Sequence, residues 1–514
     1  MVSVITPMLR HAGSQPEQLA MTDAQHSWTY AQLRDGVLAY AGALIGQGIV
    51  AGDRVLLIVP TVPEFVVAYL GIQALGAVVV PVNTMSTRAE LDYFIGAAGC
   101  SLVIAWHESS VVAADAAAAA GIRHCILPEG AAVSDVVPLT VAEERASDDV
   151  AVILFTSGTT GRAKGAELTV GNVLSAGEIA VRLAGVTPQD RIGSALPLFH
   201  VFGQTAVLMM TLTAGATMSL LDRFSAEAML ELLRRDRLTV MCGVPTMWNA
   251  MLHNAVDAVP ADFIHLRLAL SGGASLPGAV NSAFQEKFGC TLFEAYGLTE
   301  TTAIGTYGGP GTPPGSVGAA AFQTEVQIRD SAGSPVVGDA SGEVYIKGPT
   351  IMRGYRGRPD ATAEVLSADG WLRTGDVGKL DAEGNLRIVG RAKELIIRGG
   401  YNVYPSEVEA VLYAHPEVLE AAVIGIAHAH YGEEVAAVIV VNPGMPHDGA
   451  ALMAWARERL SAYKIPRVLQ FVDELPKGST GKILKRAIDR EALAQLLVVQ
   501  AKAKAKAKAM ATGR

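Results

Sequence analysis

The sequence predicts a mixed α/β and α+β protein in which a large N-terminal domain precedes a small C-terminal domain. The chain has 514 residues, 50% of them hydrophobic, which is more than one ordinary domain holds. Apolar helical segments alternate with short β-branched strands near the start, and a glycine-punctuated series of short strands follows from about residue 317. Helix and strand alternate again from about residue 394 to residue 490.

The first part of the chain predicts layered α/β subdomains. Within residues 28–105, Ala- and Leu-rich helical segments lead into strands such as 54–59 and 76–81. The alanine-rich stretch 111–120 predicts a surface helix, because alanine has the highest helix propensity.

The second part predicts a β-rich subdomain and a separate small domain. We expect the N-terminal domain to span 1–392, with its β-rich subdomain at about 317–390, and a mobile C-terminal lid domain to span 393–490. The tail, 491–514, alternates Lys with Ala and has no hydrophobic face, so a frayed helix or, more simply, a disordered basic segment is expected.

Composition narrows the functional classes. A net charge of −9 argues against a nucleic-acid or membrane-surface binder. The four cysteines lack CxxC spacing, so neither a zinc site nor a disulfide framework is expected, and reduced thiols fit a cytoplasmic protein. No run approaches the ~18 apolar residues of a membrane span, and the start shows no signal peptide. A homodimer remains open.

The loop 155–165 combines hydroxyls, glycines and cations directly after the apolar strand 150–154. Its glycines allow backbone N–H groups to approach phosphate oxygens, and Lys164 adds charge. It is not a Walker A motif, because Gly165 follows the lysine, and on its own it could be a surface turn. The candidate phosphate-binding residues are Thr156, Ser157, Gly158, Thr159, Thr160 and Lys164.

Five further motifs follow in order. They read Ser-Gly-Gly-Ala (271–274), Phe-Glu-Ala-Tyr-Gly-Leu-Thr-Glu-Thr (293–301), Trp-Leu-Arg-Thr-Gly-Asp (371–376), Gly-Arg (390–391) and Pro-Lys-Gly-Ser-Thr-Gly-Lys (476–482). Together they resemble the ANL superfamily of adenylate-forming enzymes, and within it acyl-CoA synthetases of the fatty-acid and 4-coumarate ligase type. The resemblance covers about residues 20–490 and implies the ANL fold, ATP and Mg²⁺, and coenzyme A as co-substrate.

The resemblance implies a nucleotide site built from separate motifs. The flat ring of Tyr296 and the thin backbone of the 271–274 motif are similar to the family's adenine slot, although a core tyrosine beside a glycine turn is the alternative. Asp376 matches the ribose-binding aspartate, and Arg391 resembles a ribose or phosphate contact, with a structural Asp–Arg salt bridge as the competing interpretation. The implied adenine-slot residues are Gly272, Gly273, Ala274, Glu294, Ala295 and Tyr296.

The resemblance also implies the groups that act on the phosphates. Glu300 would help to hold Mg²⁺, for which one carboxylate suffices, and Thr299 would contact phosphate; a solvated glutamate is the alternative. Lys482 would reach the substrate carboxylate and the α-phosphate and stabilise the charge that develops there, unless it is an ordinary solvated lysine. Thr156 is a further catalytic candidate. Two neighbours, Lys477 and Lys485, are expected to be surface charges.

Because Lys482 belongs to the small domain, that domain is expected to swing in for adenylation and out for the second step. Lys393 matches the family's hinge, where many relatives carry Asp. Gly399, Gly400 and Tyr401 would then face the site in the second conformation and leave a narrow slot for phosphopantetheine.

The implied reaction adenylates a carboxylic acid with ATP and transfers the acyl group to CoA. Within 197–203, which forms a wall of the acyl pocket in the family, His200 could lie against the carboxylate or gate the pocket, and a packed core histidine is the alternative. The segment has no Asp to bind an ammonium group, which disfavours amino acids. Ala295 stands where malonyl-CoA synthetases carry an Arg, which disfavours dicarboxylates.

A hydrophobic monocarboxylic acid remains: medium or long fatty, aryl or polycyclic. The residues that suggest a roomy apolar pocket are Val201, Phe202, Gly272, Gly273 and Ala303. An acyl-AMP ligase that loads a carrier protein is the main alternative, followed by a luciferase-like oxygenase and a nucleotide-binding scaffold without catalysis.

Overall fold

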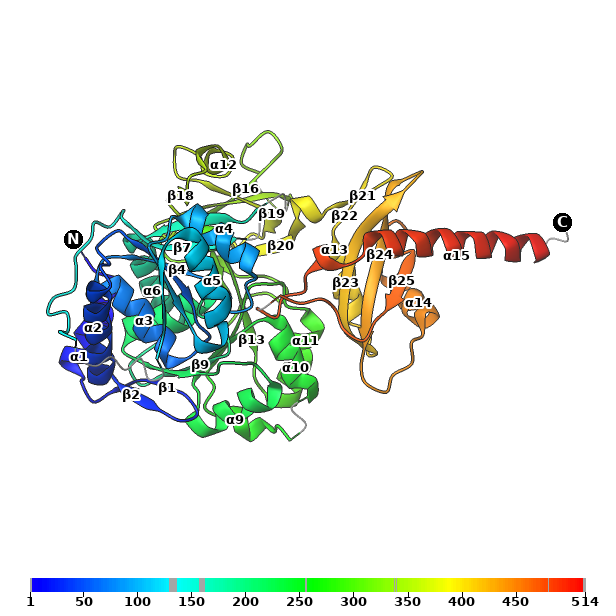
Figure 1. The fold of residues 1–514 in the computed structure, drawn as a ribbon. Helices are drawn as coiled ribbons and strands as arrows, with labels where there is room; N and C mark the ends of the chain where they lie inside the picture. The colour runs from blue at the N-terminus through cyan, green and yellow to red at the C-terminus, as the bar shows by residue number, and fades with distance from the viewer. Residues whose placement is uncertain are drawn as a thin grey trace.

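The structure, a computed structural model, describes residues 2–128, 136–156, 162–254, 257–336, 338, 340–478 and 480–511, with side chains as far as residue 500. A large N-terminal body is followed by a smaller C-terminal body, from which the last helix projects (Figure 1). This confirms the predicted mixed α/β architecture with a large and a small domain.

A seven-stranded sheet in the order β18-β8-β7-β4-β3-β5-β6 forms the first layer of the large body. Its strands are β3 (Arg54–Ile58), β4 (Val78–Pro81), β5 (Leu102–Ala105), β6 (Arg123–Ile126), β7 (Val150–Thr156), β8 (Lys164–Thr169) and β18 (Gly354–Tyr355). Strands β3 to β7 run parallel, and β8 returns antiparallel to β7 with Thr156 opposite Lys164. The predicted phosphate loop is therefore the connection of a hairpin, and Ser157, Gly158, Thr159 and Thr160 lie outside the described residues.

Helices cover this sheet as the alternating pattern predicts. They are α1 (Thr6–Ser14), α2 (Tyr30–Gly46), α3 (Pro63–Ala74), α4 (Arg88–Ala98) and α5 (Ser110–Ala120). Thr29 and Gln32 form a capping box at the start of α2. Every residue of α3 except Glu64 is buried, which explains why Gln73 is its only other polar residue. Helix α5 is the expected alanine-rich helix, and it buries Ala113, Ala116 and Ala117.

A nine-stranded sheet forms the second layer, in the order β15-β14-β13-β12-β11-β9-β10-β1-β2. Its strands are β1 (Leu19–Thr22), β2 (Ser27–Thr29), β9 (Arg191–Ser194), β10 (Thr217–Leu220), β11 (Val240–Gly243), β12 (Leu268–Ser271), β13 (Leu292–Tyr296), β14 (Thr306–Tyr307) and β15 (Ala319–Ala320). Strands β11, β12 and β13 are parallel. Their carboxyl ends meet at one edge, where open α/β sheets bind ligands.

The helices of this layer are α6 (Val170–Ala184), α7 (Val201–Gly203), α8 (Met210–Ala214), α9 (Ala226–Asp236), α10 (Pro245–Asn254) and α11 (Gly278–Phe288). A π-helical segment, Gln204–Met209, joins α7 to α8. Such segments are rare and occur often at functional sites. It directly follows the segment for which the sequence predicts an acyl-pocket wall.

The β-rich subdomain is a four-stranded antiparallel sheet in the order β16-β17-β19-β20. Its strands are β16 (Glu325–Arg329), β17 (Gly342–Lys347), β19 (Leu372–Leu380) and β20 (Leu386–Arg391), and the short helix α12 (Pro359–Ala363) precedes β19.

The small body holds a five-stranded sheet and three helices. These elements are β21 (Ile396–Arg398), β22 (Tyr401–Val403), α13 (Pro405–Tyr413), β23 (Val418–His428), β24 (Gly432–Val441), α14 (Gly449–Arg459), β25 (Val468–Phe471) and α15 (Arg490–Ala511). Helix α15 packs on the sheet through Leu493 and then extends away from it (Figure 1). Of the two forms that the sequence leaves open for the tail, the structure has a helix as far as Ala511. Among the described residues, no helix is long and apolar enough to cross a membrane.

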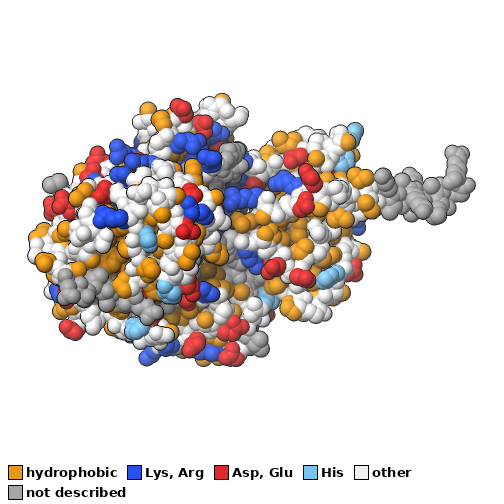
Figure 2. All heavy atoms as spheres, in the orientation of Figure 1, with side chains coloured by type: hydrophobic (Ala, Val, Ile, Leu, Met, Phe, Trp, Pro, Cys, Tyr) orange, Lys and Arg blue, Asp and Glu red, His pale blue; other side chains and the backbone are white. Residues whose placement is uncertain are grey.

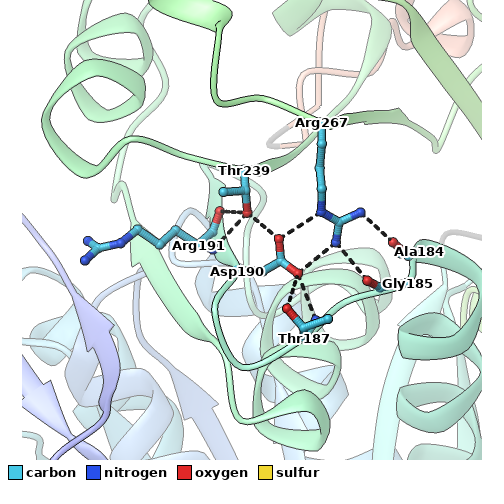
Figure 3. Close-up of polar contacts among 7 residues, drawn as sticks. All are labelled: Ala184, Gly185, Thr187, Asp190, Arg191, Thr239 and Arg267. Carbon is cyan, nitrogen blue, oxygen red and sulfur yellow. Dashed lines mark hydrogen bonds and ion pairs between the residues drawn. The ribbon is translucent and has the colours of Figure 1, made fainter.

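An Asp–Arg cluster fastens the nine-stranded sheet to the end of α6 (Figure 3). Asp190 accepts hydrogen bonds from Arg267, at 2.8 and 2.9 Å, and from the Thr239 hydroxyl at 2.6 Å. Arg267 also donates to the carbonyls of Ala184 and Gly185. Burial opposes ionisation of Asp190, but these bonds and those from Thr187 outweigh it and lower its pKa to about 2.

Candidate active site

The 271–274 motif begins where β12 ends, and its first glycine touches the predicted acyl wall. A Cβ atom at Gly272 would lie 2.9 Å from Cζ of Phe202 and 3.4 Å from the carbonyl oxygen of Ala295. Gly273 has a φ of +81°, in the region that favours glycine. Ala274, like Gly273, is exposed. Only a glycine fits at 272, so the motif lies flat against β13 and Phe202.

The structure brings three of the predicted nucleotide residues into one cluster. The Tyr296 hydroxyl at the end of β13 donates to Asp376 Oδ2 at 2.6 Å, and Arg391 Nε lies 3.1 Å from Asp376 Oδ1. Asp376 and Arg391 face each other as register partners on β19 and β20. Burial and the Asp376 carboxylate raise the pKa of Tyr296, and the same carboxylate raises the pKa of Arg391. The salt bridge weighed as an alternative therefore exists, and the same carboxylate also receives Tyr296.

Lys482 of the small body lies near this cluster. The side chain as a whole is exposed, but the protein around the ammonium removes part of its water. This desolvation, and next the charge of Arg391, lower the pKa of the ammonium. Asp376 and Glu394 act in the opposite direction. Several Lys and Arg side chains lie along the junction between the two bodies (Figure 2). The junction therefore places a cation from the small domain beside the predicted nucleotide residues.

His200 faces the same junction. Burial and the charge of Lys482 lower the pKa of its imidazole to about 4, so the ring is neutral at pH 7. The Phe202 N–H donates to His200 Nδ1 at 3.2 Å. A neutral ring that accepts at Nδ1 carries its proton on Nε2, where it can donate to an anionic oxygen. The next two residues, Val201 and Phe202, are buried.

Glu300 and Lys164 meet at a shared tyrosine. The Tyr355 hydroxyl donates to Glu300 Oε1 at 2.7 Å, and Lys164 Nζ lies 4.8 Å from the centre of the Tyr355 ring. Thr156 lies opposite Lys164, and its hydroxyl donates to the Lys164 carbonyl at 3.4 Å. Thr299 and Glu300 belong to one 3₁₀ turn, Thr299–Thr301. This turn and the β7–β8 hairpin thus converge, although they are more than 130 residues apart in sequence.

The described residues contain no group of three or more His, Cys, Asp or Glu side chains that could hold a metal ion. Magnesium is commonly bound by one or two carboxylates together with substrate phosphates and water. Glu300, with one oxygen free of Tyr355 in the described contacts, fits such a site.

Glu294 belongs to the same strand as Tyr296, two residues before it. Burial raises the pKa of its carboxyl to about 7, although the Leu276 N–H donates to it at 3.1 Å. Ala295 pairs with Tyr307 on β14. Glu294, in the middle of β13, is thus a carboxyl group that is partly protonated near neutral pH.

Two residues with a strained backbone border the site: Ala303, which the sequence predicts for the acyl pocket, and Thr302, which sequence reasoning missed. Thr302 and Ala303 have φ values of +49° and +64°, which residues with a β-carbon rarely adopt. The Thr302 hydroxyl donates to the Thr350 carbonyl at 2.7 Å, and the Thr205 hydroxyl donates to the Thr302 carbonyl at 2.9 Å. These bonds hold the strained turn against the π-helical segment. Neither residue type signals positive φ, so the sequence offers no pattern for it.

The residues predicted for the second step lie elsewhere. Gly399, Gly400 and Tyr401 form the β21–β22 turn; Tyr401 is 59% exposed and stacks on Tyr463 with ring centres 4.8 Å apart. Among the described contacts, none joins this turn to Asp376 or Tyr296. Lys393 is exposed in the 3₁₀ turn Ala392–Glu394.

The expectation for Lys485 is wrong. Its ammonium lies 2.7 Å from Glu409 and 3.4 Å from Glu394, and the side chain is mostly buried. Burial opposes its charge, but the two carboxylates prevail and raise its pKa. Lys485 is therefore an internal ion-pair residue of the small domain. Lys477 is partly exposed and paired with Glu420 at 2.6 Å.

Fold and site together define an adenylate-forming enzyme with a large N-terminal and a small C-terminal domain. The family model described as AMP-binding enzyme matches residues 8–356, and the one described as AMP-binding enzyme C-terminal domain matches residues 407–482. The chain belongs to the AMP-binding enzyme family and is an acid–thiol ligase, as the sequence predicts.

The relatives cover nearly the whole chain. A feruloyl-CoA synthase from Amycolatopsis is 36% identical over 499 residues, 94% of this chain and 97% of that protein. The 3-[(3aS,4S,7aS)-7a-methyl-1,5-dioxo-octahydro-1H-inden-4-yl]propanoyl:CoA ligase of Mycobacterium tuberculosis is 36% identical over 493 residues, 91% of this chain and 95% of that protein. The crystal structure of ATP-bound MatB from Rhodopseudomonas palustris is 33% identical, with a TM-score of 0.89 over 96% of this chain and 99% of that chain.

Proposed function

We propose that the chain is an ATP-dependent acyl-CoA synthetase for a hydrophobic monocarboxylic acid. In the first step a carboxylate oxygen bonds to the α-phosphorus of ATP and pyrophosphate leaves, which gives acyl-AMP. In the second step the CoA thiol attacks the acyl carbon, its proton is released, and AMP leaves. The observation that carries the proposal is the cluster of Tyr296, Asp376 and Arg391, toward which Thr246 holds the residue that precedes Lys482.

The geometry supports a role for each of these residues. The Asp376 carboxylate, fixed by Tyr296 and Arg391, accepts hydrogen bonds from the ribose hydroxyls. The Lys482 ammonium faces the negative charge that grows on the α-phosphoryl oxygens as the carboxylate attacks, and it therefore stabilises the transition state more than the ground state.

The phosphates extend toward the β7–β8 hairpin. Lys164 and Thr156 contribute charge and a hydroxyl there, with the loop residues between them. Glu300 and the adjacent Thr299 would hold Mg²⁺ and phosphate. The ion, when bound, offsets the charge of the pyrophosphate that leaves.

The acid is a monocarboxylate with an apolar body. His200 offers one neutral N–H to its carboxylate, and Val201 and Phe202 are buried apolar neighbours. Ala295 supplies no cation for a second carboxylate. The names of two relatives, a feruloyl-CoA synthase and a polycyclic propanoyl:CoA ligase, support an aryl or polycyclic acid as the substrate of this chain.

The second step requires the small domain to move. We place the boundary between 1–392 and 393–490, with Lys393 as the hinge. The β21–β22 turn with Gly399, Gly400 and Tyr401 then replaces Lys482 at the junction and forms the phosphopantetheine slot. The glycines leave this turn thin, and Tyr401 is exposed in the present orientation.

The test measures the two half-reactions separately in the variant Lys482→Ala. Adenylation, measured as pyrophosphate release over a panel of fatty, aryl and polycyclic acids, falls by about 10²–10³-fold. Thioester formation from supplied acyl-AMP and CoA stays near the wild-type rate. Arg486→Ala, which removes an exposed cation four positions further along the chain, is the control and leaves both steps intact.

Because the pKa of Lys482 is lowered, the wild-type adenylation rate declines on the alkaline side below the ordinary lysine pKa of about 10.5. Lys482→Arg moves that decline upward. Equal loss of both half-reactions in Lys482→Ala would contradict the assignment. Pyrophosphate release without thioester in the wild type would instead favour the acyl-AMP ligase that loads a carrier protein.

A further inference from the structure

The N-terminal half of α10 carries two side chains that bond across the junction to the small domain. Thr246 Oγ1 donates to the carbonyl oxygen of Gly481 at 2.8 Å. Asn249 Nδ2 donates to the carbonyl oxygen of Leu419, also at 2.8 Å. The two residues are three positions apart and so share one face of the helix. Neither belongs to a motif that suggests a role in catalysis.

Gly481, the acceptor of the Thr246 bond, directly precedes Lys482. Its φ of +76° and its surroundings both require glycine, since a Cβ atom there would lie 3.0 Å from Thr246 Oγ1 and 3.4 Å from Val244 Cγ2. The turn is closed internally, because Gly478 N–H donates to the Lys482 carbonyl at 2.8 Å and Gly481 N–H donates to the Gly478 carbonyl at 2.9 Å. The Thr246 bond therefore holds the main chain directly before Lys482.

Helix α10, which carries Thr246 and Asn249, is itself held in place within the large domain. Asn249 is buried, and α10 follows β11, whose carboxyl end forms part of the edge that holds the 271–274 motif. The N–H of Gly272 donates to the Gly243 carbonyl at 3.1 Å. The Thr246 hydroxyl therefore fixes the lysine turn to the same framework as the predicted adenine slot.

We propose that Thr246 is a positioning residue for the adenylation half-reaction, and that Asn249 supports it by holding the small domain in this orientation. The inference rests on the proposed two-step function. Both bonds belong to the orientation that places Lys482 at the site, and a rotation that withdraws Lys482 breaks them. Their removal therefore weakens the first step and spares the second.

The experiment compares Thr246→Val, which keeps the shape but removes the hydroxyl, with Thr246→Ser, which restores it. Acid-dependent ATP–pyrophosphate exchange falls by about 5- to 10-fold in Thr246→Val, as expected for one lost hydrogen bond, and recovers in Thr246→Ser. Thioester formation from supplied acyl-AMP and CoA does not change. Asn254→Ala, at the exposed end of the same helix, is the control for a neutral change in α10.

A second readout does not depend on activity. In the double variant Thr246→Val/Asn249→Ala, trypsin cleaves after the exposed Lys393 faster than in the wild type, because the small domain leaves the described orientation more often. Asn254→Ala is cleaved at the wild-type rate.

The outcomes are distinct. Equal loss of both half-reactions in Thr246→Val, no recovery in Thr246→Ser, or unchanged cleavage of the double variant would overturn the positioning role. Absence of exchange in the wild type with every acid would count against the proposed function, and the cleavage comparison would then still decide whether Thr246 and Asn249 hold the small domain.

Discussion

Two Asp–Arg pairs in the large domain use the same chemical groups and differ in how completely those groups are satisfied. Both oxygens of Asp190 accept hydrogen bonds from Arg267, and two further donors of that arginine bond to main-chain carbonyls. Asp376 forms an ion pair with Nε of Arg391 and accepts a hydrogen bond from the Tyr296 hydroxyl, and among the described contacts the Arg391 guanidinium donates no hydrogen bond. A closed pair stabilises the fold, whereas an open pair retains donors and acceptors for a ligand.

The largest effect is expected from a substitution that breaks the open pair of Asp376 and Arg391. In Asp376→Asn one acceptor oxygen becomes an amide donor and the charge that orients Arg391 is lost, so kcat/KM for ATP falls by about 10²-fold. The melting temperature falls less than in Asp190→Asn, because Asp376 has fewer protein donors to lose, although the two carboxylates are equally buried. The measurements are ATP titrations of pyrophosphate release and thermal unfolding. A large fall in stability with unchanged ATP dependence would make Asp376 a structural residue, as the salt-bridge interpretation holds.

The second-largest effect is expected from a substitution that breaks the closed pair of Asp190 and Arg267. Asp190→Asn leaves Arg267 without its carboxylate and lowers the free energy of unfolding by about 2–3 kcal/mol, while ATP dependence stays at the wild-type value. Arg267 is 41% exposed, so the loss stays below that of a fully buried pair. Denaturant unfolding measures the change.

Titration of the wild type sharpens this result. The folded pKa of Asp190, about 2, lies below the ordinary value of about 3.9, so its contribution is present above pH ~4 and is lost as the pH falls toward 2. It amounts to about 1–2 kcal/mol. Asp190→Asn lacks this part of the acid dependence. An identical acid slope in the variant would show that Asp190 is not held as a carboxylate by Arg267.

The contrast between the two pairs also shows what the sequence could predict. Tyr296, Asp376 and Arg391 stand in recognisable motifs, and the resemblance that these motifs carry implied a shared nucleotide site. Asp190 and Arg267 stand in no motif, and they come together only because β9, β11 and β12 are neighbours in the sheet. Sheet order is a long-range property that local patterns do not encode.

The same limit explains the misses at the site. The Thr246–Gly481 bond joins residues 235 positions apart through a common side chain and a main-chain carbonyl. The positive φ of Thr302 results from bonds to Thr350 and Thr205, which local propensity opposes. Lys485 has the composition of a surface residue, and only the packing of α13 against the lysine motif reveals its partners. Motifs identified the chemistry, whereas tertiary contacts fix how it is positioned.

The smallest effects are expected from substitutions that remove one hydroxyl next to each pair. Tyr296 and Thr239 each donate to an aspartate oxygen at 2.6 Å. Tyr296→Phe keeps the ring of the predicted adenine slot and loses only the bond that orients Asp376, so KM for ATP rises by about 3- to 10-fold and stability is unchanged. In Thr239→Val the hydroxyl that donates to Asp190 and accepts from Arg191 N–H is lost, which lowers stability by about 1–2 kcal/mol without changing KM. If each variant changed both quantities alike, the distinction between a closed and an open pair would fail, because the two hydroxyls have the same bond length and differ only in whether a ligand completes their cluster.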